Sequence, residues 1–292
     1  MATAARVQEK AATPRVERRI TVARILTYVL MILLALIFML PLLWMLSTSL
    51  KPKAQLFAPV IQWIPQTFSL ESYQKILANP AVPIGRWFVN SLIVSLAVTA
   101  LILIIDSLAA YAYARMEFPG KNLIFGLLLS TLFLPGMMFL VPNFLTINNI
   151  HLLNNYLGVI IPGLAGVFGV FFLRQFFQTI PKDLEEAAVI DGANVFQTFL
   201  MIILPLAKPA LATLAVITFL ASWNDFLWPL LVLQQADMLT LPPGLRTLQG
   251  AYTSEYGQMM AGAVIAAVPV LIIYIALQRY IVQSVASTGI KG

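Results

Sequence analysis

The sequence predicts an all-α integral membrane protein with six transmembrane helices and one cytoplasmic helix-turn-helix loop. Of its 292 residues, 60% are hydrophobic and only 10% are charged, whereas ordinary globular domains carry about 25% charged residues. The charges are also segregated, since no Asp, Glu, Lys or Arg lies between Lys121 and Arg174. An uncharged run of that length can cross a bilayer twice and cannot form the core of a soluble domain.

The chain divides into three parts by composition. Residues 1–24 form a polar and basic tail, residues 25–280 hold the apolar segments, and residues 281–292 form a short polar tail. The basic start resembles that of a signal peptide, but the apolar stretch after it is too long and shows no convincing cleavage site. We therefore expect a retained first transmembrane helix that follows a cytoplasmic tail.

Six apolar segments are long enough to cross the hydrocarbon layer, which takes about 20 helical residues. Pro135 and Gly136 are expected to kink the third segment, and the glycines of the fourth would let neighbouring helices approach closely. Phe57, Trp63 and Trp87 are aromatic residues that could lie at the membrane interface. The predicted segments are residues 25–46, 88–113, 123–141, 156–177, 207–233 and 259–280.

The basic residues predict the orientation of these helices. An even number of spans places both termini on one side, and thirteen of the eighteen Lys and Arg residues lie on that side of the predicted topology. Since cytoplasmic loops carry the excess of positive charge, both termini and residues 181–205 are expected in the cytoplasm. Most basic residues sit at the ends of apolar segments, where membrane lipid explains them better than nucleic acid does.

Residues 181–205 are an acidic segment between the fourth and fifth apolar runs. Pro181 and the carboxylates after it are typical of a helix start, and the helix dipole alone explains Asp183 and Glu185. Gly192 predicts a bend, and Asn194 can cap a second short helix. Helices this short need a surface to pack on, and their exposed apolar stripes need cover. We therefore expect a helix-turn-helix that binds a soluble partner.

The sequence lacks the residues of several common kinds of site. It has no cysteine and one histidine, His151, so no metal cluster or thiol chemistry is expected. It also lacks the G-x-x-x-x-G-K-[ST] pattern that holds ATP, and no nucleophile–base arrangement stands out. We expect neither a cofactor nor a metal in this chain, and no enzymatic activity of its own.

Asp106 and Asp225 fall inside predicted spans, where an isolated charge costs about 2.5–3.5 kcal/mol on insertion scales. Such a residue either lines a translocation path or is satisfied by neighbouring groups. The second interpretation is favoured for Asp106, while both stay open for Asp225, which has Asn224 and Trp228 nearby. An ion-coupled secondary transporter is the alternative function, but the sequence shows neither an inverted repeat nor a pair of broken spans in corresponding places.

One pattern in the acidic segment is similar to a known motif. Glu186-Ala187-Ala188, then Gly192 after three residues, then Ile202-x-Leu204-Pro205 after nine more, reproduces the EAA motif. That motif marks the membrane subunits of binding-protein-dependent ABC importers. The chain resembles in particular the smaller permease subunit of the carbohydrate importers of the maltose-transporter type, through residues 49–59, 109–122, 222–233, 241–252 and 278–292.

The resemblance implies roles for particular residues. Glu186 would make the polar contact with an ATPase, Ala187 and Ala188 would allow close packing, and Gly192 would supply the bend. The implied ATPase-coupling set is completed by Asp191, Leu204 and Pro205. The residues expected along a translocation path are Asn224, Asp225 and Trp228. The expected contacts with a binding protein are Gln249, Gly250, Tyr252 and Tyr256.

The resemblance also implies partners, substrate and location. Family members pair with a second, homologous permease subunit, bind two ATPase subunits that use ATP and Mg, and receive substrate from an extracytoplasmic substrate-binding protein. The implied location is the bacterial cytoplasmic (inner) membrane. Carbohydrate is the implied substrate. Oligosaccharides are expected, and acidic ones such as alginate fragments, or glycerol-phosphate compounds, are left open.

Overall fold

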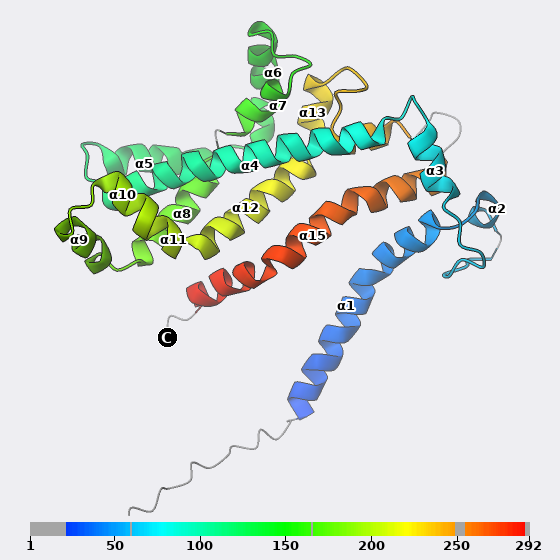
Figure 1. Cartoon of the computed structure of the whole chain (residues 1–292), viewed down its shortest axis with the longest axis horizontal. Coiled ribbons are helices and arrows are strands. Elements are labelled where there is room, and N and C mark those ends of the chain that lie inside the picture. The colour runs from blue at the N-terminus through cyan, green and yellow to red at the C-terminus, as the bar shows by residue number, and fades with distance from the viewer. Residues whose placement is uncertain (1–21, 59, 165, 249–254, 290–292) are drawn as a thin grey trace, which may run out of the picture. The chain divides into compact units, whose positions relative to one another are not determined.

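The computed structural model describes residues 22–58, 60–164, 166–248 and 255–289, and every regular element within these ranges is a helix (Figure 1). The chain divides into two compact units, residues 1–44 and 45–292. Helix α1 (Val22–Ser49) begins in the first unit, and its stretch from Arg24 to Ser49 is long and apolar enough to cross a membrane. The second unit holds the other described helices.

Two helices of the second unit are also long enough to span a membrane without a break, α4 (Ile84–Arg115) and α15 (Tyr256–Gly289). Its shorter helices are α2 (Lys53–Leu56), α3 (Glu71–Ala78), α5 (Lys121–Ser130), η1 (Thr131–Phe133), η2 (Gly136–Phe139), α6 (Leu140–Asn149), α7 (Tyr156–Gly163), α8 (Phe168–Thr179), α9 (Asp183–Ile190), α10 (Val195–Thr198), the π-helical turn η3 (Phe199–Ile203), α11 (Leu204–Leu206), α12 (Lys208–Trp223), α13 (Leu227–Val232) and α14 (Leu241–Arg246).

Three further candidate spans are pairs of helices that are bent at a break. The helices from α5 to η1 meet those from η2 to α6 at 96°, α7 meets α8 at 47°, and the helices from α10 to α11 meet α12 at 78°. If each bent pair is one span, the described residues contain six spans, as the sequence predicts.

The positions of the breaks correct part of the prediction. The kink expected at Pro135 and Gly136 is confirmed by the 96° bend between Phe133 and Gly136. Bent spans are more numerous than predicted, however, and the helix expected over 207–233 stops at Trp223 and restarts at Leu227. Two residues account for this second break. The ring of Pro229 excludes the carbonyl of Asp225 from a regular helix, and the Asp225 carboxylate accepts backbone N–H groups that a continuous helix would give to its preceding turn.

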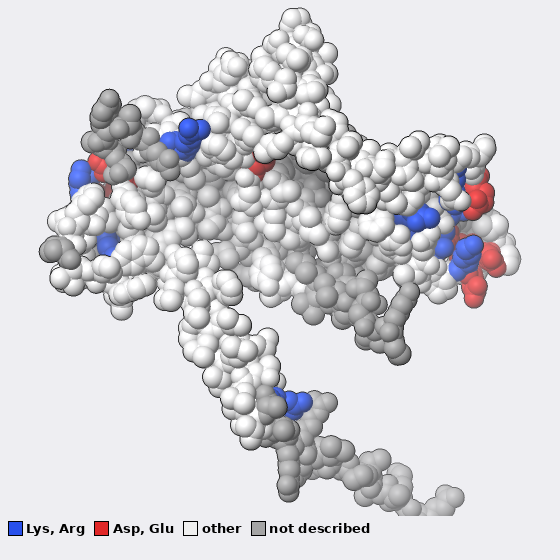
Figure 2. Space-filling model, turned by 180° about the vertical axis from the view of Figure 1, so that it is seen from behind, with Lys and Arg blue, Asp and Glu red and all other residues white. Residues whose placement is uncertain are grey.

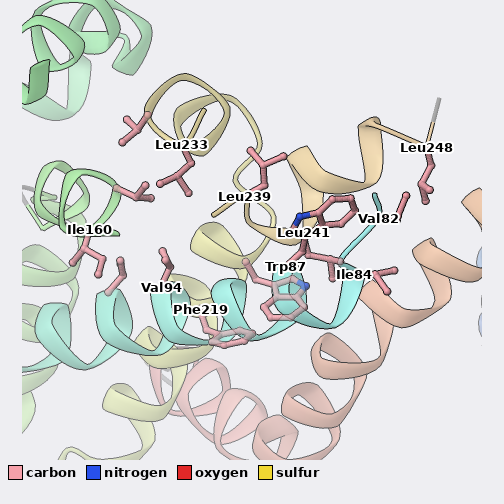
Figure 3. Close-up of a cluster of buried hydrophobic side chains, with 14 of the residues drawn as sticks. Val82, Ile84, Trp87, Val94, Ile160, Phe219, Leu233, Leu239, Leu241 and Leu248 are labelled. Atoms are coloured by element: carbon pink, nitrogen blue, oxygen red, sulfur yellow. The ribbon is translucent and has the colours of Figure 1, made fainter. Parts of the chain in front are cut away.

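Helix α4 is the central helix of the second unit. It packs against α7, α8, α12 and α14, and it runs from α3 at one end to α9 and α10 at the other (Figure 1). Near its start Trp87 is completely buried beside Leu241 of α14, in a cluster where Phe219 stacks on Trp223 at 5.6 Å between ring centroids (Figure 3). Trp87 is thus packed inside the protein, and its expected position at the membrane interface stays a prediction.

A second buried cluster surrounds the last turns of α4. Tyr111 of α4 meets Leu173 and Phe177 of α8, and its ring lies 5.0 Å from that of Phe199 in η3. Ile203, one turn further along η3, is also fully buried there. This cluster attaches residues 181–205 to the helix bundle.

Charged side chains of the second unit gather near the ends of the bundle. Figure 2 shows a broad surface between these two regions that is uncharged except for one small acidic patch on the face that is drawn. Such a distribution suits a membrane protein, since the uncharged band can face lipid while the charged ends face water.

Candidate functional site

The acidic segment folds as two short helices joined by a tight turn. Helix α9 carries Asp183, Glu185 and Glu186 in its first turn, where the positive end of the helix dipole favours them. Gly192 follows with φ +85°, a left-handed conformation that glycine adopts without strain. Its N–H donates to the carbonyl of Val189, and that of Ala193 donates to Ala188, at 3.0 and 2.9 Å. These two bonds form a Schellman motif that closes the helix at the predicted position.

The second helix begins with the cap that the sequence predicts. The Asn194 side chain accepts from the backbone of Gln197 and the Gln197 side chain accepts from the backbone of Asn194, both at 2.9 Å. The chain then continues through η3 into α11, whose Pro205 cannot supply the N–H of a regular turn. The helix therefore widens before the chain bends into α12.

The first of two adjacent glutamates faces the helix bundle. Nε of Arg115, at the end of α4, lies 2.6 Å from Oε1 of Glu185, in a charge contact rather than an aligned hydrogen bond. The Arg115 guanidinium also donates to the carbonyl of Ile180 at 2.6 Å, and the Tyr111 hydroxyl donates to Glu185 at 3.4 Å. Both charged side chains are largely buried. Glu185 thus does more than stabilise the helix start, since it joins α9 to α4.

The second glutamate, Glu186, is exposed, as are Ala187, Asp191 and Pro205, while Ala188 and Leu204 are half-buried. The expected apolar stripe of the second helix divides, since Phe199 and Ile203 are buried and Phe196 and Leu200 are exposed. Other exposed apolar side chains of the segment are Leu184, Val189, Ile190, Val195 and Met201. The segment therefore has one face bound to the bundle and one apolar face that is open for a partner.

Comparison with known proteins identifies the class of molecule. Residues 108–287, more than half of the chain, match the model of the family described as "Binding-protein-dependent transport system inner membrane component". The chain belongs to this family. It is a permease subunit of a binding-protein-dependent ABC importer, and the helix-turn-helix lies within the matched residues.

Relatives and a solved structure agree with this assignment. The permease is 35% identical to the arabinooligosaccharides transport system permease protein AraQ of Bacillus subtilis, over 93% of this chain and 97% of AraQ. It is 34% identical to the diacetylchitobiose uptake system permease protein NgcG of Streptomyces coelicolor, over 89% of this chain and 87% of NgcG. A solved bacterial ABC transporter involved in alginate import has a similar chain, with TM-score 0.78 and 26% identity, over 92% of the permease and all of that chain.

The residues predicted along a translocation path are only partly brought together. Asp225 and Trp228 line a cavity of about 210 Å³ with Thr218 and Ser222, between α4, α7, α12 and α13. The Asp225 carboxylate accepts from the backbone of Trp228 at 3.4 Å and also faces the amides of the two residues between them. Asn224 is exposed and donates to the carbonyl of Leu220. Asp225 thus lies just before Phe226, the N-cap residue of α13, and accepts from the first turn of that helix.

The second membrane carboxylate lies between two helices. Asp106 of α4 is buried and lies against Gly169 of α8, with no room for a side chain at that glycine. In the part of the chain that the structure describes, no three His, Cys, Asp or Glu side chains gather in a metal-binding arrangement.

Of the residues expected to contact a binding protein, Gln249, Gly250 and Tyr252 lie outside the described residues, and Tyr256 begins α15 partly exposed. The segment before them is fixed to the start of α4. Trp87 Nε1 donates to the carbonyl of Ala236 at 2.6 Å, and the Asn90 amide donates to the carbonyls of Asp237 and Leu239 at 2.9 and 2.8 Å. The sequence did not predict these contacts, because their only signal was a tryptophan and polar residues at the start of an apolar run.

Proposed function

We propose that this permease forms half of the pore of an ATP-driven carbohydrate importer and that residues 181–205 dock on an ATPase subunit. The observation that carries the proposal is the division of α9 into two faces. Glu185 is bound to α4, whereas the adjacent Glu186 and the nearby Val189 and Ile190 are exposed, at 63% and 85% for the two apolar residues. A surface of this kind on one side of a membrane protein needs a protein partner.

The partner must supply the energy, because the sequence of this chain has no P-loop. Two ATPase subunits that use ATP and Mg would bind the helix-turn-helix of this permease and of a second, homologous permease. An extracytoplasmic binding protein would deliver the substrate from the opposite side. The excess of Lys and Arg on the side of residues 181–205 supports a cytoplasmic location for the docking face and for both termini.

Closure of the ATPases on ATP would move the docked helix-turn-helix. Because Phe199, Ile203 and Glu185 fix the segment to the bundle, its movement would be passed to the spans instead of being lost in a flexible loop. The Schellman turn and the capping box hold the two short helices at a fixed angle during this movement.

The relatives support a carbohydrate substrate. Two of them are named for the transport of arabinooligosaccharides and diacetylchitobiose, and the solved transporter is involved in the import of alginate. Another relative is named as a permease for sn-glycerol 3-phosphate. We propose an oligosaccharide as the substrate, with an acidic oligosaccharide as the specific alternative that the alginate transporter suggests.

The test is co-purification and transport with the full complex. The permease, its partner permease, ATPases and binding protein are reconstituted in proteoliposomes and supplied with arabinooligosaccharides, alginate oligosaccharides, diacetylchitobiose or glycerol 3-phosphate. ATP-dependent uptake of one of these is expected, and Glu186→Lys or Gly192→Pro is expected to abolish it. Glu117→Lys is the matched control, because it reverses a charge that is 90% exposed on the same side of the membrane. A permease that purifies without any ATPase and transports normally with Glu186→Lys would contradict the proposal.

A further inference from the structure

Helix α4 connects the candidate ATPase-docking segment to the segment that precedes the expected binding-protein loop. We infer that α4 is the rigid connector that transmits movement between these two sides, and that Arg115 and Glu185 at one end, with Trp87 and Asn90 at the other, are the positioning residues that attach it. The inference rests on the proposed function and assigns the transmission to particular residues.

The length and continuity of α4 suit this role. It runs for 32 residues from Ile84 to Arg115 without an internal proline or a break, which corresponds to roughly 48 Å of helix. Three of the other candidate spans are pairs of helices bent at a break. A continuous helix packed on both α8 and α12 instead moves as one body.

One end of α4 holds α9 through buried charge. The Arg115 guanidinium contacts both Glu185 within α9 and the carbonyl of Ile180 just before it, at 2.6 Å in each case. The contact is largely shielded from water, with 7% of the Arg115 side chain and 15% of the Glu185 side chain exposed. A displacement that separated these groups would leave two buried charges without partners, which is unfavourable. A movement of α9 is therefore followed by the end of α4.

Helix α8 reinforces this end. Arg174 Nε donates to the carbonyl of Tyr113 near the last turn of α4, at 3.2 Å, and its guanidinium lies 4.2 Å from the centroid of the Phe125 ring. Since α8 leads directly into α9, the helix before the docking segment and the segment itself are both fixed to the same two turns of α4.

The other end of α4 holds residues 236–241 just as closely. Trp87 and Asn90 donate to three backbone carbonyls there, and the N–H of Leu241 donates to the hydroxyl of Ser91 at 2.7 Å. The ring of Trp87 fills the space under Gly244 of α14, where a larger residue would overlap it (Figure 3). Residues 236–246 must therefore follow the start of α4 when it moves.

These contacts predict an uncoupled phenotype when the Arg115–Glu185 pair is removed. The Schellman turn and the capping box are local to residues 188–197 and do not involve Arg115, so the docking face keeps its shape. The ATPases should still bind and hydrolyse ATP, but their movement would no longer reach α4. ATP would then be consumed without a matching amount of transport.

The first experiment measures the ATP hydrolysed per substrate taken up by the complete complex in proteoliposomes. Glu185→Gln, which keeps the size and removes the charge, is expected to raise this ratio about tenfold, within the usual range of coupling energies between sites. The exchanged pair Arg115→Glu with Glu185→Arg is expected to restore part of the coupling. Glu117→Gln is the control, because it breaks an ion pair with Lys121 on the same side, in which the Glu117 side chain is 90% exposed, and it should leave the ratio unchanged.

The second experiment reads the far end of α4. The chain has no cysteine, so Gln235→Cys gives this permease one labelling position, with the partner subunits made free of cysteine. A fluorescent label on this cysteine is expected to respond to ATP with vanadate when the rest of the permease is wild type or carries Glu117→Gln. It is not expected to respond when the permease also carries Glu185→Gln. Trp87→Phe, which leaves the Arg115–Glu185 pair intact, is expected to raise the ATP consumed per substrate as well.

The outcomes separate this inference from the proposed function. If the wild-type complex transports substrate with ATP but Glu185→Gln keeps the normal ratio and the normal label response, the connector inference is wrong and the proposed function stands. If Glu185→Gln does not assemble, Trp87→Phe decides the question, and a normal ratio in that variant overturns the inference. If the wild-type complex shows no ATP-dependent uptake, the proposed function fails first.

Discussion

The carboxylate of Asp106 on α4 lies directly against Gly169 on α8, and a methyl group at Gly169 would overlap this carboxylate and crowd the side chain of Leu214. Gly169→Ala should therefore force α4 and α8 apart and destabilise the permease by about 1–3 kcal/mol. The midpoint of thermal unfolding of the purified complex measures this loss. Gly126→Ala is the control, because that helical glycine has open space around it and should gain helix propensity. Equal midpoints for the two variants would contradict the packing argument.

The conformation of Gly192 allows a graded test of the turn. Nothing crowds this position, so the cost of a side chain comes from its φ of +85° alone. Gly192→Ala should cost about 1–2 kcal/mol, and Gly192→Asn should cost less because asparagine tolerates this region. Gly192→Pro should be the most damaging, since proline fixes φ near −65° and removes the N–H that bonds Val189. Uptake and ATPase co-purification should follow this order, and a proline variant as active as the asparagine variant would contradict it.

The capping box should stabilise the second short helix independently of the membrane spans. Asn194→Ala removes the acceptor for the backbone N–H of Gln197 and should cost about 1 kcal/mol. Asn194→Ser keeps an acceptor at the same position and should recover most of it. Hydrogen exchange at the amides of residues 197 and 198 measures the difference. Protection unchanged by the alanine substitution would show that packing of Phe199 alone holds the helix.

Asp225 is expected to stabilise the first turn of α13 through the backbone N–H that its carboxylate accepts. Asp225→Asn keeps an oxygen that can accept from the backbone of Trp228, so uptake should be nearly normal. Asp225→Ala leaves the first amides of α13 without this acceptor and should lower stability by about 1–2 kcal/mol. Transport in proteoliposomes and the unfolding midpoint distinguish the two effects. If Asp225→Asn expresses and assembles normally but does not transport, the carboxylate belongs to the translocation path.

Much of this permease can be predicted from local chemistry. The bends at Gly136 and Gly192 and the cap at Asn194 follow from residues that set the backbone within a turn of themselves. The number of spans follows from the lengths of the apolar runs. These features need no knowledge of what packs against them.

The features that could not be predicted depend on contacts between distant residues. Glu185 and Glu186 are equivalent by composition, and only the position of Arg115, seventy residues earlier in the chain, separates them. Trp87 is buried because α14 covers it. Its ring N–H donates to the carbonyl of Ala236, which lies 149 residues later in the chain. The break after Trp223 depends on the side chain of Asp225, which accepts from the first backbone N–H groups after it. Hydrophobicity alone does not indicate this contact.

The different orientations of Glu185 and Glu186 restrict how this part of the chain can change length. Successive residues of an α-helix are turned by about 100° from each other, so adding or deleting one residue before Glu185 within α9 would turn it away from its inward position. The inward carboxylate would leave Arg115, and the outward face would present a different set of side chains to its partner. Insertions and deletions accumulated during evolution should therefore fall in the connections that flank the spans, such as residues 116–120, and spare α9 and its turn.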